Sequence, residues 1–165
     1  RKGLPLLLRA WRDAGVDGEL LIAGEIHDEV HAVCGDLLHV RGVVPLGHVQ
    51  DIAAVYHSAD VFVFPTHEEG GPQVTFEAAG CGLALVVSEM GAAGAFRDAT
   101  DAIVLDPYAH DAWVATLRSL DRDRDRVLQY QRAARQRAAD YTWEKVAWRR
   151  LAMLQARFGT TVDPR

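Results

Sequence analysis

The chain has 165 residues, of which 49% are hydrophobic and 25% are charged. This composition is that of an ordinary globular domain, so it excludes a disordered, a collagen-like or a coiled-coil chain. No apolar run approaches the ~20 residues that a membrane span needs, and the first residues show no signal-peptide pattern. The two cysteines, Cys34 and Cys81, make no disulfide framework, so we expect reduced thiols in a cytoplasmic protein.

The net charge of −5 is divided unevenly along the chain. Residues 1–117 hold 6 basic and 17 acidic side chains, whereas residues 118–165 hold 12 basic and 6 acidic ones. A basic segment of this kind can contact nucleic acid or an anionic membrane surface. No stripe of aromatic residues accompanies these charges, so we expect a solvated helical face and no nucleic-acid partner. Peripheral membrane contact of a longer protein stays an open alternative.

Strand and helix signals alternate along the chain. A helix start comes first, at Arg1–Trp11, and apolar runs then alternate with helical patterns. The expected strands are Glu19–Gly24, Leu37–Val44, Val61–Pro65, Leu83–Ser88 and Ala102–Leu105. The expected later helices are Val49–Asp60, Pro72–Cys81, His110–Leu120, Arg122–Asp140 and Thr142–Phe158.

Strands separated by helices imply βαβ units. We therefore expect an α/β fold, a Rossmann-like, doubly wound parallel sheet of about five or six strands flanked by helices. Ligands of such sheets bind beyond the carboxyl ends of the strands. A doubly wound domain normally opens with a strand, whereas this sequence opens with a helix. We expect the chain to be a piece of something longer.

The loop after the Val61–Pro65 strand carries the clearest chemical signal. Gly70 and Gly71 fall at a strand-to-helix turn, where backbone amides can approach a ligand and the helix directs its positive end at it. Such a turn suits phosphate. Glu69 precedes the helix and Glu77 lies within it, with seven residues between them. Apolar neighbours flank Glu77, where a carboxylate is costly unless it accepts hydrogen bonds, for example from a sugar or ribose diol. The alternative is a capping carboxylate and a surface glutamate.

This segment resembles the glutamate–seven residues–glutamate signature of the group 1 family of retaining glycosyltransferases, which have the GT-B architecture. The resemblance covers nearly the whole chain, and residues 58–91 carry its most specific part. The successive stretches that match are "LLIAGE", "VRGVVPLGHVQDIAAVYHSADVFVFPT", "EEGGPQVTFEAAGCGLALVVSEMG", "DAIVLDP" and "YTWEKVAWRRL". By this resemblance, residues 1–165 are the carboxy-terminal donor-binding domain, one half of a GT-B fold. The resemblance implies that the chain is a fragment, and we expect it to lack the first strand of that domain and the amino-terminal acceptor domain.

The resemblance implies a site for a nucleotide-diphosphate sugar, whose sugar is transferred to an acceptor with retention of anomeric configuration. Glu77 would bind the ribose hydroxyls, and Glu69 would lie beside the transferred sugar as the catalytic candidate. Gly70 and Gly71 would face the sugar and the diphosphate. Lys2, in a Lys-Gly pair at the start of a helix, would hold the diphosphate.

The resemblance adds three further residues to the expected donor site. Gly47 and His48 match a loop whose backbone contacts the nucleobase. His67 adjoins the signature and could reach the donor sugar, with an ordinary loop histidine as the alternative. No metal or cofactor is expected, because helix-terminal amides and a lysine can stabilise the charge of a departing nucleoside diphosphate.

The sequence also departs from the family pattern. Gly24–Ile26 lacks the second glycine of a usual Gly-x-Gly turn, and Ala92–Ala95 stands where the family often has a glutamate. Without an acceptor domain, the isolated chain is expected to be inactive. The alternatives are a sugar-nucleotide epimerase of similar architecture and a non-catalytic nucleotide-sugar-binding module.

Two other groups of residues are given structural roles. His27 and His31 have a possible metal-ligand spacing, but the zincin pattern, with glutamate directly after the first histidine, is absent, so no metal site is expected there. Trp113, Trp143 and Trp148 fall in expected helices and are assigned to the core or to a domain contact.

Overall fold

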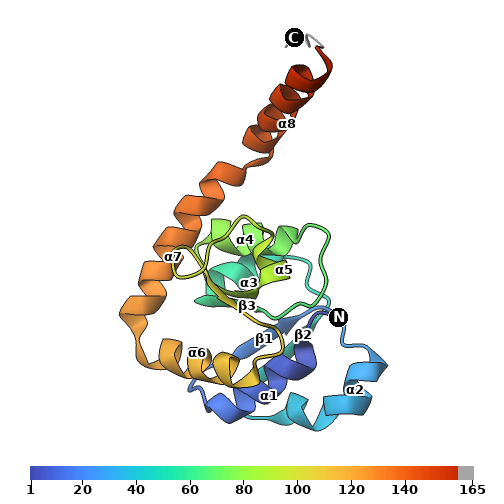
Figure 1. The fold of residues 1–165 in the computed structure, drawn as a ribbon. Coiled ribbons are helices and arrows are strands. Elements are labelled where there is room, and N and C mark those ends of the chain that lie inside the picture. The colour runs from blue at the N-terminus through green and yellow to red at the C-terminus, as the bar shows by residue number, and fades with distance from the viewer. Residues whose placement is uncertain (160–165) are drawn as a thin grey trace.

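A computed structural model describes residues 1–159 of the chain as strands alternating with helices (Figure 1). The elements in chain order are α1 (Leu4–Ala14), β1 (Leu20–Ala23), α2 (Asp28–Cys34), the 3₁₀ turn η1 (Gly35–His39), β2 (Val43–Gly47), α3 (Ile52–Ser58), β3 (Val61–Phe64), α4 (Gln73–Cys81), β4 (Ala84–Ser88), α5 (Glu89–Ala92), β5 (Ile103–Leu105), α6 (His110–Arg122), α7 (Arg124–Ala138), the 3₁₀ turn η2 (Ala139–Tyr141) and α8 (Trp143–Phe158).

Every ladder between these strands is parallel, which confirms the expected α/β class. β1 pairs with β2, with Leu20 opposite Val43. β3 pairs with β4, and β4 pairs in turn with β5. The strands thus form two ladders, β1-β2 and β3-β4-β5, and within residues 1–159 no ladder joins β1 to β3. The expectation of a single sheet is wrong in this respect, although the five strands agree with the expected number.

The two faces of β4 separate two hydrophobic clusters. Ala84 and Val86 belong to the cluster that includes α1 and α6, whereas Leu85 and Val87 belong to the cluster that includes α4 and α7. This alternation is that of a strand covered by helices on both faces. Figure 1 shows α1 and α6 on one side of the strands and α3 and α4 on the other.

The burial of β3 differs from that of a central strand. All four of its residues are half-buried, whereas all five residues of β4 are buried. Within residues 1–159, β3 has no strand partner on its second edge, which leaves its apolar side chains partly in contact with solvent. The central strand of this ladder is therefore β4.

One expected strand is misplaced. Leu37 and Leu38, taken as the start of a strand, lie in the 3₁₀ turn η1 and are buried in the α1 cluster. The strand begins only at Val43, after Gly42, whose φ of +82° is a turn conformation. It also includes Pro45, a residue that an edge strand tolerates. The expected strand Leu37–Val44 therefore overlaps the observed strand only at Val43 and Val44.

The expected carboxy-terminal helix is confirmed as α8, with Thr142 as its cap through a hydrogen bond that its hydroxyl accepts from the Lys145 amide (3.3 Å). Figure 1 shows this helix extending away from the body of the molecule. Trp143 and Trp148 are 74% and 54% exposed, so they do not lie in the core, whereas Trp113 is fully buried. No helix of residues 1–159 is long and apolar enough to cross a membrane.

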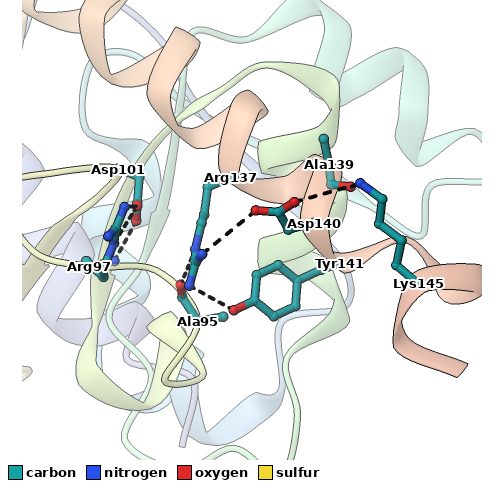
Figure 2. A network of polar contacts seen from close by, with 8 residues as sticks. All are labelled: Ala95, Arg97, Asp101, Arg137, Ala139, Asp140, Tyr141 and Lys145. Atoms are coloured by element: carbon teal, nitrogen blue, oxygen red, sulfur yellow. Dashed lines mark hydrogen bonds and ion pairs between the residues drawn. The ribbon is translucent and has the colours of Figure 1, made fainter. Parts of the chain in front are cut away.

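The joint between α7 and α8 is tied to the loop that follows α5. Arg137 donates hydrogen bonds to the Ala95 carbonyl (2.8 Å) and to the Tyr141 hydroxyl (2.9 Å), as Figure 2 shows. Within the loop, the Arg97 guanidinium pairs with the buried Asp101 carboxylate (2.8 Å). The Tyr141 ring also packs 5.2 Å from the Phe76 ring, centroid to centroid. These contacts fix where α8 leaves the domain.

Candidate functional site

The start of α1 meets the loop after β3 at the carboxyl end of that strand. The Arg1 carbonyl accepts a hydrogen bond from the His67 amide at 3.0 Å. Gly3 has a φ of +79°, and a Cβ placed on it would lie 2.0 Å from the Pro65 carbonyl oxygen. Glycine is therefore required where the two segments touch. This close approach brings Lys2 beside the expected donor loop.

Lys2 and Glu69, which are 67 positions apart in the sequence, form an ion pair. Lys2 Nζ lies 2.5 Å from Glu69 Oε1, and the lysine side chain is 51% exposed whereas that of the glutamate is 11% exposed. Lys2 Nζ also lies 5.6 Å from the centroid of the Phe64 ring. The structure therefore brings together the two residues expected at the diphosphate and at the transferred sugar.

Glu69 has a second partner that sequence reasoning missed. The Thr66 hydroxyl lies 3.0 Å from the same oxygen, Oε1, and Thr66 is fully buried. The only signal in the sequence was the position of a hydroxyl residue directly after an apolar strand, at the edge where ligands bind.

Glu77 lies on α4 and is exposed. The expectation that its carboxylate lies close to an apolar face is wrong, because the flanking residues Ala78 and Ala79 are buried in the core whereas Glu77 is exposed. Its partner is Tyr56 of α3, whose hydroxyl donates to Glu77 Oε2 at 3.5 Å. Burial of the phenol, followed by the negative charge of Glu77, raises the pKa of Tyr56 to about 12.

The glycine turn before α4 is open. Both Gly70 and Gly71 are exposed, and a Cβ placed on either would meet no atom within 4 Å. Pro72 precedes the helix and provides no side-chain cap, and its carbonyl accepts a hydrogen bond from the Thr75 amide (3.2 Å). Within residues 1–159, the first-turn amides without a hydrogen-bond partner are therefore those of Gln73 and Val74. Free amides at a helix start are suited to binding an anion.

Gly47 and His48 lie at the carboxyl end of β2. The Gly24 amide, at the end of β1, donates to the Gly47 carbonyl at 2.7 Å, and Gly47 has a φ of +63°. His48 is exposed. Within residues 1–159, no hydrogen bond or ion pair connects His48 with Glu69 or Glu77.

His67 faces a neighbouring cleft. Its ring centroid lies 5.0 Å from that of Tyr108, and its buried Nδ1 has no hydrogen-bond partner among the described residues. The cleft is open and has a volume of about 600 Å³. It is lined by Arg1, Gly3, Pro5, Leu6, Arg9, Arg12, Asp13, His67, Pro107, Tyr108 and His110.

The two histidines with metal-ligand spacing do not gather other ligands. His27 is the residue before α2 and His31 lies in its last turn. In the described part of the chain, no group of three or more His, Cys, Asp or Glu side chains is placed to hold a metal ion.

Comparison with known sequences gives one family and several relatives. Residues 1–123 match the sequence model of the family described as "Glycosyl transferases group 1". The D-inositol 3-phosphate glycosyltransferase of Segniliparus rotundus is 31% identical over 106 residues, which are 64% of this chain and 24% of that protein. The protein of the same name from Salinispora tropica is 29% identical over 96 residues, 58% of this chain and 20% of that protein. The chain thus spans about a quarter or less of these relatives.

Solved structures give the same picture of the fold. Sucrose-phosphate synthase from Thermosynechococcus elongatus superposes with a TM-score of 0.80 at 22% identity, over 98% of this chain and 43% of that one. Anabaena HepE in complex with UDP-glucose gives a TM-score of 0.77 at 17% identity, over 95% and 46% of the two chains. At these identities the likeness shows the fold, which corresponds to one half of such glycosyltransferases.

Proposed function

Because the chain belongs to the group 1 glycosyltransferase family, we propose that it binds the nucleotide-diphosphate sugar donor, whose sugar is then transferred to an acceptor with retention of configuration. The observation that carries this proposal is the meeting of Lys2 and Glu69 beside the open Gly70–Gly71 turn. A cation, a carboxylate and free helix amides are thereby gathered at the carboxyl end of β3, where parallel sheets bind ligands.

Each group has a part in this proposal. The Lys2 ammonium and the first amides of α4 bind the diphosphate and stabilise the charge that builds on its oxygen as it leaves. The Glu69 carboxylate lies beside the transferred sugar and supports developing positive charge at the anomeric carbon. Glu77 accepts hydrogen bonds from the ribose hydroxyls, and the backbone at Gly47 and His48 contacts the base. His67, whose ring packs against Tyr108, is proposed to reach the donor sugar. No metal is required by this arrangement.

The Lys2–Glu69 ion pair has a consequence for donor binding. A diphosphate carries more negative charge than one carboxylate and is itself a strong acceptor, so it competes with Glu69 for the lysine. Lys2 is half-exposed and has a flexible side chain, whereas Glu69 is mostly buried. We therefore expect the lysine to move to the diphosphate while Glu69 stays in place.

UDP-linked sugars are the first donors to test. The Anabaena protein of the same fold was solved with UDP-glucose bound. Calorimetric titration of the chain with UDP and with UDP-glucose should show binding of both. The epimerase alternative predicts conversion of the UDP-sugar to an isomer without an acceptor, and the binding-module alternative predicts no transfer when an acceptor domain is present.

We also propose that the chain is the donor-binding domain of a two-domain protein, completed by a strand that precedes α1. In the described part of the chain, β1 and β3 each have one edge without a strand partner, and the apolar side chains of β3 are half-buried. α1 starts beside Pro65, at the carboxyl end of β3, and leads back to β1, so β1 and β3 run in the same direction. A right-handed crossover through α1 would place the preceding strand between them.

This proposal predicts slower exchange of β3 amides. In a longer chain that carries the residues preceding Arg1, the β3 amides that point away from β4 should exchange with deuterium more slowly than in the 165-residue chain, because these amides gain a hydrogen-bond partner. The amides of β4 are already paired and serve as the control. Unchanged exchange along β3 would contradict the insertion of a strand.

A further inference from the structure

Three hydroxyl side chains are fully buried between β3, β4 and α4, where no direct part in donor binding has been assigned to them. Thr66, Thr75 and Ser88 are each 0% exposed. A buried hydroxyl is costly unless it is hydrogen-bonded, and all three are bonded. The Thr75 hydroxyl donates to the Gly91 carbonyl (2.8 Å), and the Ser88 hydroxyl donates to the Thr66 carbonyl (2.5 Å). The Gly91 amide in turn donates to the Ser88 hydroxyl (3.1 Å). The Thr66 carbonyl is therefore held by Ser88 at the end of β4, and the Ser88 hydroxyl is itself oriented by the Gly91 amide of α5.

The Thr66 hydroxyl has one proton and three acceptors within reach. Glu69 Oε1 lies at 3.0 Å, the Glu68 carbonyl at 3.2 Å and the Arg1 carbonyl at 3.4 Å. The carboxylate oxygen is both the nearest and the charged acceptor, so it forms the strongest of the three possible bonds. The hydroxyl proton is accordingly directed at Glu69.

We propose that Thr66 is a positioning residue that holds the Glu69 carboxylate in place beside the donor sugar. The proposal rests on the donor-binding function proposed above. In the unliganded site, Glu69 Oε1 receives bonds from both Lys2 and Thr66. When Lys2 turns to the diphosphate, Thr66 is the partner that stays, because its backbone is anchored and its side chain is buried. Thr66 acts through Glu69 and touches no substrate itself.

The test compares Thr66→Val, which removes the hydroxyl at similar volume, with Thr66→Ser, which keeps it. Thr100→Val, at an exposed threonine, is the control. Calorimetry with UDP and with UDP-glucose should show that Thr66→Val leaves the affinity for UDP unchanged and lowers that for UDP-glucose by about two- to tenfold. Thr66→Ser should bind both ligands as the unmodified chain does. Equal losses on both ligands, or no loss on UDP-glucose, would overturn the proposal.

A second readout needs no ligand. In a double-mutant cycle, the fall in denaturation midpoint caused by Thr66→Val should be smaller when Glu69 is already alanine, because the bond is then gone. Additive shifts would overturn the proposal. If neither UDP nor UDP-glucose binds, the donor function fails for these donors, and this cycle alone decides whether Thr66 holds Glu69. If Thr66→Val does not fold, Thr66→Ala is measured in the same way.

Discussion

Replacing Lys2 with alanine is expected to weaken the binding of UDP by roughly tenfold to a hundredfold, since hydrogen bonds to a charged group are worth about 1.5–3 kcal/mol. Lys2 is half-exposed, which screens its charge and favours the lower part of that range. The loss should be the same for UDP and UDP-glucose, because both carry the diphosphate. Calorimetric titrations of the two ligands measure it.

The only other lysine of the chain, Lys145, provides the control for this substitution. Its ammonium donates to the Ala139 carbonyl (2.7 Å) at the joint between α7 and α8, away from the donor loop. Lys145→Ala should leave the affinity for UDP unchanged. A Lys2→Ala protein that binds UDP as tightly as the unmodified chain would show that the diphosphate lies elsewhere.

Replacing Glu77 with alanine is expected to cost a similar roughly tenfold to hundredfold in UDP affinity, because the ribose hydroxyls lose a charged acceptor. The matched ligand is 2′,3′-dideoxyuridine diphosphate, which lacks both hydroxyls. Toward this ligand, Glu77→Ala and the unmodified chain should have the same affinity. Glu19→Ala, at an exposed glutamate before β1, is the matched control variant. A loss that persists with the dideoxy ligand would mean that Glu77 does not contact the ribose.

The sequence predicted the bounds of those helices and strands that are determined by a pattern of neighbouring residues. Period and glycine placement located β3, α4, β4 and α8 within one or two residues, because apolar runs and helix caps determine these elements directly. The misplaced β2 shows the limit of this reasoning. Leu37 and Leu38 are apolar because they are buried against α1, and an apolar pair says nothing about whether its backbone is a strand or a 3₁₀ turn.

The candidate site was foreseen in its residues but not in its contacts. Lys2 and Glu69 were named through the family resemblance, yet their pairing depends on how α1 approaches the loop after β3. The hydrogen bond between Tyr56 and Glu77 joins two helices, so it follows only from the three-dimensional structure. The bond between Thr66 and Glu69 depends on the conformation of the loop that carries both residues. The half-exposure of β3 was also hidden, since an apolar strand sequence does not reveal whether its second edge is paired.

The division of the donor between the two glutamates is the central claim, and titrating Glu69→Ala and Glu77→Ala with UDP and UDP-glucose tests it most directly. Glu77→Ala should lower the affinity for UDP and the affinity for UDP-glucose by the same factor. Glu69→Ala should lose only the affinity that the glucose adds, and it should bind bare UDP at least as well as the unmodified chain, because Lys2 is released from its ion pair. Equal losses of UDP affinity in the two variants would contradict this assignment of the pair.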